Sequence, residues 1–324
     1  MHIETSFKPA WWLPSPHLQT LWPVMFRRRT APDLSHERFE LNDGDFVDLC
    51  WSRKTDRPVV IVLHGLEGSV HSHYAGSLLC ALENAGFRPV FMHFRGCGGE
   101  PNRLPRSYHS GDTQDLAQLV DHINRTSDTS VHAAIGFSLG GNVLLKWLGQ
   151  TGDSNPLQFG VAVSVPFMLA DAANRLQRGL SHMYEIHLMN SLKRSYIEKF
   201  KRIESPLDVE ISQLKGFWEF DDRVTAPLHG FRGVDHYYSE SSCRQYLANI
   251  KVPTRIIHAL DDPFMFTATV PDENELSEHV ELLLARNGGH VGFVSGMYPW
   301  KPEYWYEDKI IEFLVNSEKL KMKN

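Results

Sequence analysis

Gly136-Phe137-Ser138-Leu139-Gly140 is the stretch of sequence that decides the fold. It lies between a short apolar run of strand type at 131–135 and a helix-forming run at 141–148. A serine on such a strand-to-helix turn is held above the sheet edge, where its hydroxyl can meet a substrate. The glycines leave room for the tight turn. Because a glycine-rich turn can match this pattern by chance, its meaning depends on the rest of the chain.

Strand-like and helix-like stretches alternate around this turn. The continuous apolar run at 59–63 is typical of a strand buried on both faces of a parallel sheet. Further strands are expected at 89–94, 159–165, 254–260 and 280–285. Helices are expected at 74–85 and 304–317, and a further helix is expected to begin at Asp112, with Asp112 and Asp115 in its first turn. An Asp-Gly turn within 42–45 predicts an antiparallel hairpin between 38–41 and 46–51. The pattern predicts an α/β fold with a mostly parallel central sheet and helices on both faces.

The alternation stops between 167 and 250, where the chain looks helical and irregular and is rich in Met, Tyr, Phe and Arg. This block is too long for a plain crossover, so we interpret it as an inserted helical cap. The predicted organisation is an N-terminal arm (1–35), a first part of the core (36–166), the cap (167–250) and a second part of the core (251–324).

The arm itself carries tryptophans and prolines followed by three arginines at 27–29. We expect it to be extended and packed on the body. The alternative is an amphipathic surface near the mouth of the site or at a lipid interface, where aromatic and arginine side chains suit headgroups.

Composition bounds the class of protein. The 324 residues are 42% hydrophobic and 22% charged, which is ordinary for a globular protein, and the net charge of −6 gives no support for a nucleic-acid partner. The four cysteines form no Cys-x-x-Cys pair, so we expect no metal site. We expect all four to be reduced thiols. The chain shows neither a signal-peptide pattern nor an apolar run that could span a bilayer, which favours the cytoplasm.

Candidate catalytic residues follow three of the expected strands. Serine needs a base, and the base needs an orienting acid. Ser138, then Asp261 or Asp262, then His290 come in the order Ser, acid, His, each on a loop after a strand. We favour Asp262 as the acid, because Pro263 restricts its backbone and could hold its carboxylate steady; the other aspartate would cap a loop.

An ester oxyanion would need backbone N–H donors. The N–H of Leu139, just after the serine, is one candidate. The loop after the 59–63 strand, His64 to Gly68, supplies the other, and we choose the N–H of Leu66.

With these residues placed, nearly the whole chain resembles the α/β-hydrolase superfamily, and within it the YheT family of esterases. The stretches that carry the resemblance are 17–20 (HLQT), 64–69 (HGLEGS), 94–99 (FRGCGG), 108–113 (YHSGDT), 136–142 (GFSLGGN), 220–222 (FDD) and 261–265 (DDPFM). The resemblance implies Ser138, Asp262 and His290 as charge-relay residues and the hydrolysis of carboxylic esters, with acylglycerol-like substrates among relatives. The reaction expected of these residues needs no cofactor.

Other uses of this site are acyl transfer or perhydrolysis by the same residues, and a non-catalytic binding protein on the same fold. Haloalkane dehalogenases and epoxide hydrolases are disfavoured, because their elbow carries Asp where this chain has Ser138. Within the predicted cap, we expect the apolar side chains of Phe167, Met168, Met183 and Tyr184 to line an acyl pocket.

Overall fold

The computed structural model describes residues 1–321 except residues 31, 54 and 128. The strands are β1 (His2–Glu4), β2 (Ser35–Glu40), β3 (Phe46–Trp51), β4 (Val59–Leu63), β5 (Arg88–Met92), β6 (Val131–Phe137), β7 (Phe159–Val163), β8 (Thr254–Ala259), β9 (Val280–Ala285), β10 (Val294–Tyr298) and β11 (Lys301–Tyr304). The α-helices are α1 (Pro16–Phe26), α2 (Ala75–Asn84), α3 (Gln114–Thr126), α4 (Leu139–Thr151), α5 (Leu169–Leu176), α6 (His182–Phe200), α7 (Phe217–Phe220), α8 (Ala226–Leu228), α9 (Val234–Ser241) and α10 (Trp305–Lys321).

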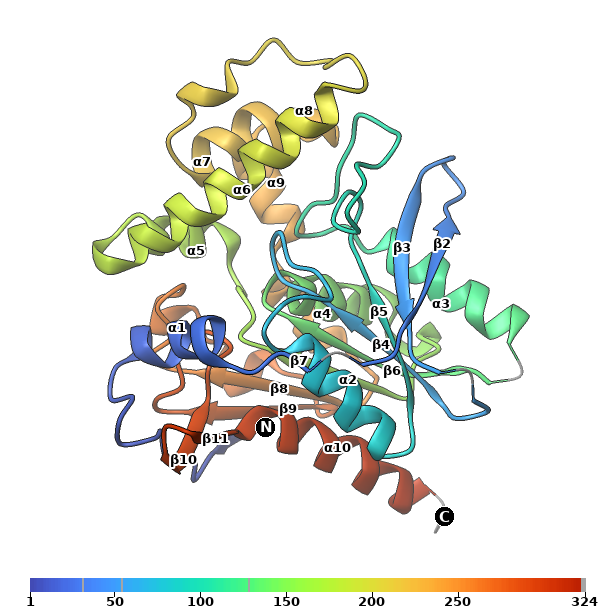
Figure 1. The fold of residues 1–324 in the computed structure, drawn as a ribbon, viewed down its shortest axis with the longest axis vertical. Coiled ribbons are helices and arrows are strands. Elements are labelled where there is room, and N and C mark those ends of the chain that lie inside the picture. Colours follow the sequence, from blue (N-terminus) through green and yellow to red (C-terminus); the bar gives the residue numbers. More distant parts are fainter. Residues whose placement is uncertain (31, 54, 128, 322–324) are drawn as a thin grey trace.

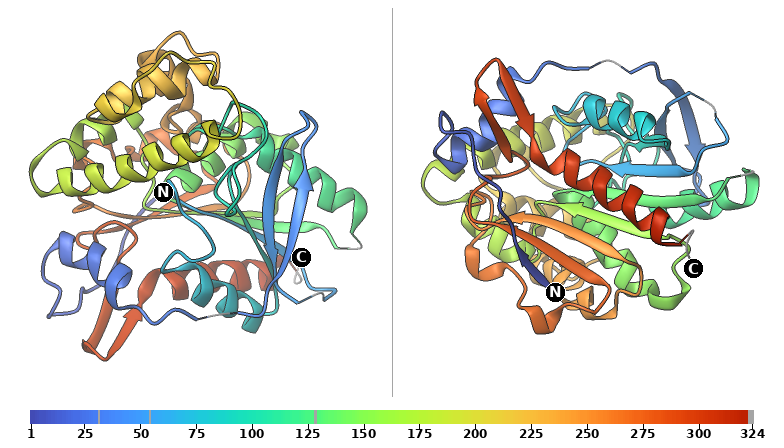
Figure 2. Two further views of the ribbon diagram at one scale, coloured as in Figure 1. Left: turned by 45° about the horizontal axis from the view of Figure 1, so that its top comes forward. Right: turned by 90° about the horizontal axis from the view of Figure 1, so that it is seen from below.

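A nine-stranded sheet forms from the described residues, in the order β1-β9-β8-β7-β6-β4-β5-β3-β2. The β2–β3 and β3–β5 pairs are antiparallel and the others are parallel. Figures 1 and 2 show this twisted sheet with helices on both of its faces. The predicted α/β class with a mostly parallel sheet is confirmed, as is the hairpin at the Asp-Gly turn.

Alternating side chains of β4 explain why both faces are covered. Val59, Ile61 and Leu63 enter one hydrophobic cluster, together with apolar residues of α3 and α4. Val60 and Val62 enter a second cluster, on the opposite face, with residues of α2 and α10. All five side chains of the strand are buried, which is the pattern that a parallel sheet between two helical layers requires.

The start of α3 corrects one prediction. The helix begins at Gln114 rather than at Asp112, and Thr113 precedes it. Asp112 does not cap the helix; its carboxylate lies 2.5 Å from Nη2 of Arg106. This pairing is partly buried, so it competes well with a bond to the helix N-terminus.

The N-terminal segment is not simply an extended arm. Residues 2–4 add β1 to the sheet edge beside β9, and residues 16–26 form α1. The hydroxyl of Ser15 accepts a hydrogen bond from the N–H of Leu18, and Pro16 stands in the first turn, where a missing N–H costs nothing. One of the prolines of the expected extended arm, Pro16, therefore starts a helix.

The segment from α5 to α9 gathers at the top of Figure 1, beyond the sheet. Its apolar side chains form their own cluster, which includes Leu176, Met189, Phe217 and Tyr238. Such a separate cluster lets the segment pack as a unit above the core.

No helix within the described parts of the chain is long and apolar enough to cross a membrane. Cys50, Cys80, Cys97 and Cys243 are free thiols.

Candidate active site

Ser138 occupies the sharp turn between β6 and α4. Its backbone has φ 50° and ψ −116°, a strained conformation for a residue with a side chain. The turn is closed so tightly that a Cβ on Gly136 would lie 2.3 Å from the carbonyl oxygen of Gly140. A Cβ on Gly140 would lie 2.5 Å from the carbonyl oxygen of His64. Only glycine fits at these two positions, and their contacts hold the serine where its hydroxyl leaves the sheet.

His290 and Asp262 meet Ser138 from two neighbouring loops. Asp262 follows β8, and His290 follows β9. The Oγ of Ser138 lies 3.0 Å from Nε2 of His290. The Nδ1 of the same imidazole lies 2.8 Å from Oδ2 of Asp262. A carboxylate only accepts hydrogen bonds, so Nδ1–H donates to it and Nε2 is left to accept from the serine hydroxyl.

The two adjacent aspartates have different partners. The Oδ1 of Asp262 accepts a hydrogen bond from the N–H of Phe264 at 2.8 Å, which fixes its carboxylate beside the imidazole. Asp261 instead accepts from the N–H of Gly289 at 3.0 Å and from the side-chain amide of Asn287 at 3.2 Å. Burial raises the pKa of Asp261. Of the two candidates, the structure brings Asp262 to the histidine and uses Asp261 to tie down the loop that carries it.

Helix α1 supports that loop from outside. The hydroxyl of Thr20 accepts a hydrogen bond from the backbone N–H of His290 at 2.9 Å and donates to the carbonyl of Pro16 at 2.8 Å. The approach is close: a Cβ on Gly289, where φ is +62°, would lie 2.5 Å from the carbonyl oxygen of Pro16, and one on Gly292 would lie 2.4 Å from the carbonyl oxygen of Gln19. Both glycines are needed for helix and loop to touch.

The ring of Phe264 lies flat on the imidazole of His290, with the ring centroids 3.9 Å apart and the planes 4° from parallel. Sequence reasoning gave neither this residue nor Thr20 a role in the site. Their signal was their place in the stretches HLQT and DDPFM, which the resemblance had singled out.

Two tyrosines shape the loop after β4. The N–H of Gly65 donates to the hydroxyl of Tyr74 at 3.2 Å, and the N–H of Glu67 donates to the hydroxyl of Tyr108 at 2.8 Å. Between them, the N–H of Leu66 has no acceptor among the residues that the structure describes. The N–H of Leu139, in the first turn of α4, also has none there. Two unpaired donors thus lie on the two chain segments that meet at the elbow.

The side chain of His64 connects the same loop to a neighbouring loop by hydrogen bonds and stays neutral. Its Nδ1 lies 2.6 Å from the carbonyl oxygen of Gly65, to which it donates, and its Nε2 accepts from the N–H of Phe94 at 3.0 Å. Burial lowers the pKa of His64 to about 3. It therefore serves as a fixed bridge between loops, since its proton stays on Nδ1. Within the described residues, no group of three His, Cys, Asp or Glu side chains is arranged to hold a metal ion.

The four side chains expected in an acyl pocket lie in different surroundings. The hydroxyl of Tyr184 lies 3.0 Å from Nδ1 of His17, and its ring centroid lies 4.9 Å from that of Phe264. Phe167 is fully buried in the main core, with its ring against His258. Met168 lies with its sulfur 3.4 Å from Nη1 of Arg244, and Met183 is 62% exposed. Of these four, Tyr184 is linked to the histidine of the site through Phe264.

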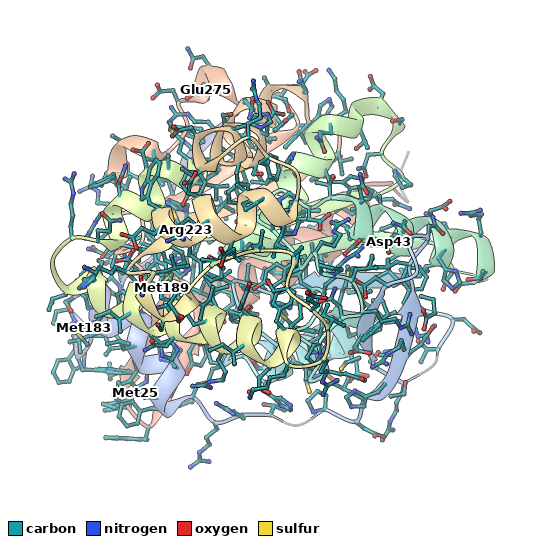
Figure 3. The ribbon with its side chains drawn as sticks, turned by 90° about the horizontal axis from the view of Figure 1, so that it is seen from above. Met25, Asp43, Met183, Met189, Arg223 and Glu275 are labelled. Atoms are coloured by element: carbon teal, nitrogen blue, oxygen red, sulfur yellow. The ribbon has the colours of Figure 1, made fainter. Side chains whose placement is uncertain are left out.

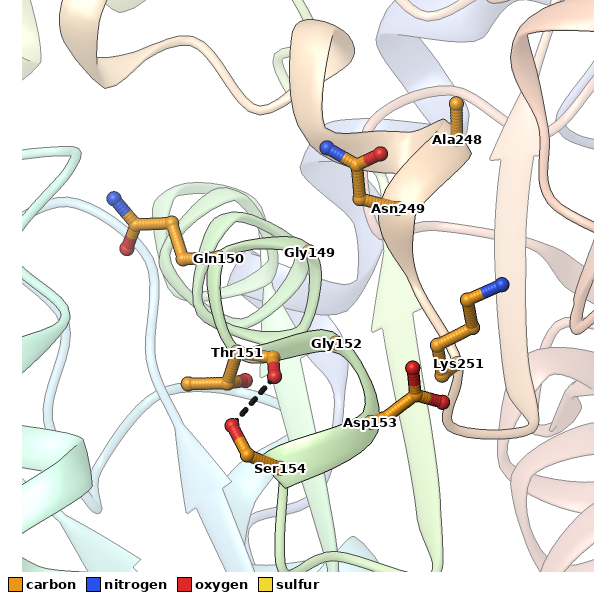
Figure 4. Close-up of a pocket in the computed structure, with 9 residues that line it drawn as sticks. All are labelled: Gly149, Gln150, Thr151, Gly152, Asp153, Ser154, Ala248, Asn249 and Lys251. Carbon is orange, nitrogen blue, oxygen red and sulfur yellow. Dashed lines mark hydrogen bonds between the residues drawn. The ribbon is translucent and has the colours of Figure 1, made fainter.

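A hollow of about 490 Å³ at the opposite end of α4 is not part of this site (Figure 4). Thr151 and Asn249 are among the residues that line it. Ser138 precedes the first residue of the 13-residue helix, so the hollow lies a helix length of about 20 Å away. Its lining is mostly polar, and the hydroxyl of Ser154 in it donates to the carbonyl oxygen of Thr151 rather than to a base.

The fold and the elbow geometry define a hydrolase of the α/β class. The model of the alpha/beta hydrolase fold family matches residues 58–296. The chain is 41% identical over 306 residues to the candidate esterase YheT of Escherichia coli (strain K12), covering 92% of this chain and 90% of that protein. The chain belongs to the α/β-hydrolase superfamily and, within it, to the YheT family.

Other similar proteins have narrower names. The phospholipase ABHD3 of Mus musculus is 27% identical over 97% of this chain and 79% of its own length. The monoacylglycerol lipase ABHD2 of Mus musculus is 28% identical over 94% of this chain and 78% of its own length. Among solved structures, the Pyrococcus furiosus esterase Pf2001 aligns over 88% of this chain and 92% of its own, with a TM-score of 0.56 and 18% identity. That likeness shows the fold.

Proposed function

We propose that the protein is a serine esterase in which Ser138 is the nucleophile, His290 the general base and Asp262 the acid that orients the imidazole. One observation carries this proposal: Ser138, His290 and Asp262 form an unbroken hydrogen-bonded chain, with distances of 3.0 and 2.8 Å. This is the arrangement that makes a serine hydroxyl nucleophilic at neutral pH. Family membership supports the same chemistry.

In the first half of the reaction, Oγ of Ser138 bonds to the ester carbonyl carbon while its proton passes to Nε2 of His290. The carbonyl π electrons move to the oxygen, which becomes an oxyanion. The unpaired N–H groups of Leu66 and Leu139 stabilise that charge. When the tetrahedral intermediate collapses, the ester C–O bond breaks and the leaving alcohol takes the proton from the imidazolium. An acyl-enzyme remains.

In the second half, a water molecule gives a proton to His290 as its oxygen bonds to the acyl carbon. The second oxyanion is stabilised by the same two N–H groups. Its collapse breaks the bond to Oγ, and Ser138 recovers its proton from the imidazolium. The acid is released and the starting state is restored.

We propose acylglycerol-like esters as the substrate class, because relatives are named as a phospholipase and a monoacylglycerol lipase. Tyr184 is the residue best placed to touch an acyl or alcohol group, since it lies beside the ring that covers His290. Met168 and Met183 remain proposed pocket residues of the cap, whereas the expectation for Phe167 is wrong, because its side chain is fully buried in the main core. The free cysteine thiols support a reducing compartment such as the cytoplasm.

The test uses p-nitrophenyl esters of graded acyl length together with a fluorophosphonate probe. Ser138→Ala should lose the probe label and about 10⁶-fold in kcat, as expected for the nucleophile of a triad. Ser154→Ala, at an exposed serine beyond α4, is the control and should label and turn over like the parent protein. Full turnover by a folded Ser138→Ala protein would refute the proposal.

A further inference from the structure

Large apolar side chains remain exposed in three segments that are far apart in the sequence. The N-terminal segment contributes Trp11, Leu18, Val24, Met25 and Phe26; the β10–β11 hairpin contributes Met297, Tyr298 and Trp300; the start of the cap contributes Leu180, Met183 and Ile186. Trp11 is 75% exposed and Trp300 is 80% exposed. A typical exposed apolar residue stands alone, whereas a gathering of this kind marks an interaction surface.

Contacts join the three segments into one surface. The indole N–H of Trp11 donates to the carbonyl of Met297 at 3.0 Å, and that of Trp12 donates to the carbonyl of Gly296 at 3.2 Å. On the other side of α1, Nδ1 of His17 is hydrogen-bonded to the hydroxyl of Tyr184 in α6. In Figure 1, α1 lies between the hairpin and α5–α6, and in Figure 3 Met25 and Met183 lie on the same side of the molecule. We call this surface the apolar face.

The same segments carry a net positive charge, although the whole chain has a net charge of −6. Residues 8–29, 175–186 and 294–304 contain Lys8, Arg27, Arg28, Arg29, Arg175, Arg178 and Lys301. Of these, Arg27 is buried and forms an ion pair with Glu307. Their acidic residues are Glu185, which is buried, and Glu303, which is exposed in β11. Arg28 and Arg29 are exposed directly after the last turn of α1. The apolar face is therefore bordered by more exposed cations than exposed acids.

We propose that the apolar face docks on a bilayer surface that carries anionic phospholipids. Tryptophans at the edge of an apolar surface suit the headgroup region, where one side of the ring is wet and the other apolar. Lysines and arginines near such a surface are attracted by its negative potential. Docking of a second copy of the chain is disfavoured, because a two-fold interface would bring Arg28 and Arg29 towards their own like charges.

The position of the face agrees with a bilayer as its partner. From His17 on α1, contacts continue through Tyr184 and Phe264 to the imidazole of His290. Docking would therefore place the candidate active site next to the membrane surface.

The test is flotation with lipid vesicles, measured on the Ser138→Ala protein so that no lipid is consumed. Vesicles of phosphatidylcholine alone are compared with vesicles in which phosphatidylglycerol replaces part of it. The protein should float with the anionic vesicles, and added salt should release it, because the attraction between exposed charges is screened. Because hydrolysis is not measured, failure of docking would leave the esterase proposal intact.

Substitutions separate the two contributions. Arg28→Ala/Arg29→Ala should weaken partition into anionic vesicles about 25-fold, from the expected contribution of each basic residue. Trp11→Ala/Trp300→Ala should weaken it by about tenfold or more through lost apolar burial. The matched controls are Arg53→Ala/Arg125→Ala for charge and Ile197→Ala for an exposed apolar residue, since none of these lies in the three segments. The controls should bind like the parent.

Two results would overturn the proposal. One is the absence of binding to anionic vesicles by a folded parent protein. The other is a dimer in analytical ultracentrifugation that dissociates in Trp11→Ala/Trp300→Ala, which would make the apolar face an interface between copies. Melting curves of every variant exclude unfolding as a cause, which matters for Trp11 because its indole is hydrogen-bonded to the hairpin.

Discussion

Replacing Asp262 with Asn should abolish most activity, and the structure gives a specific reason. The N–H of Phe264 donates to Oδ1 of Asp262. In Asp262→Asn, this donor holds the amide oxygen at the Oδ1 position, so the amide NH₂ must face Nδ1 of His290. An NH₂ group only donates, and Nδ1 would have to accept. The proton of the neutral imidazole then sits on Nε2, where it blocks acceptance of the proton from Ser138.

The size of the effect follows from the loss of the correct tautomer. In a serine protease with the same triad, this substitution lowers kcat by about 10⁴. The corresponding increase in the activation free energy is about 5.5 kcal/mol. We expect a loss of this order for Asp262→Asn, with the fold retained because the hydrogen bond to Phe264 is preserved.

Asp261→Asn is the matched control, one residue away and with the same change of charge. Its oxygen can still accept from the N–H of Gly289, and the side chain of Asn287 can turn its own oxygen towards the new NH₂ group. Activity should be largely retained, with a loss of about 1 kcal/mol in unfolding free energy. Steady-state kinetics on a p-nitrophenyl ester measure the activity of both variants, and melting curves measure their stability. The reasoning fails if Asp261→Asn is inactive while Asp262→Asn turns over normally.

Three further variants test the surroundings of the site. Thr20→Val removes the acceptor for the N–H of His290, so kcat should fall by about 10- to 100-fold with KM little changed; Thr20→Ser should restore it, and a normal kcat in the valine variant would contradict the support from α1. Gly140→Ala should cost about 1–3 kcal/mol of stability and most of the activity, because its Cβ would lie 2.5 Å from the carbonyl oxygen of His64; calorimetry and kinetics that match the parent would count against the tight elbow. Burial lowers the pKa of His258 to about 4 from the ordinary 6.5, so its stabilising effect is present above pH 6.5 and is lost as the pH falls towards 4. Relative to His258→Leu, urea unfolding should show the parent losing about 3 kcal/mol over that range; an unchanged difference would show that His258 is not held neutral.

Local sequence pattern was sufficient for the strands of the central sheet other than β1, and for placing Ser138, the Asp261–Asp262 pair and His290 on loops after three of them. The inner parallel strands β4, β6, β7, β8 and β9 are short, largely apolar runs, and Ser138, Asp262 and His290 each follow one of them. Because parallel strands end at one edge of the sheet, three loops far apart in sequence had to meet there. The choice between Asp261 and Asp262 needed more than the sheet, and the structure places only Asp262 within hydrogen-bond reach of the imidazole.

The contribution of α1 could not be derived in the same way, because it consists of contacts across the whole chain. Thr20 and His290 are 270 positions apart, and the prolines around α1 hide its helical period. The sequence nevertheless contains both sides of the contact between α1 and the loop of His290. Gly289 and Gly292 are small because the backbone of α1 passes within about 2.5 Å of where their Cβ atoms would be. The helix that carries much of the apolar face is thus also the support of the catalytic histidine loop. Any displacement of α1 at a membrane surface would reach His290 directly, through the hydroxyl of Thr20.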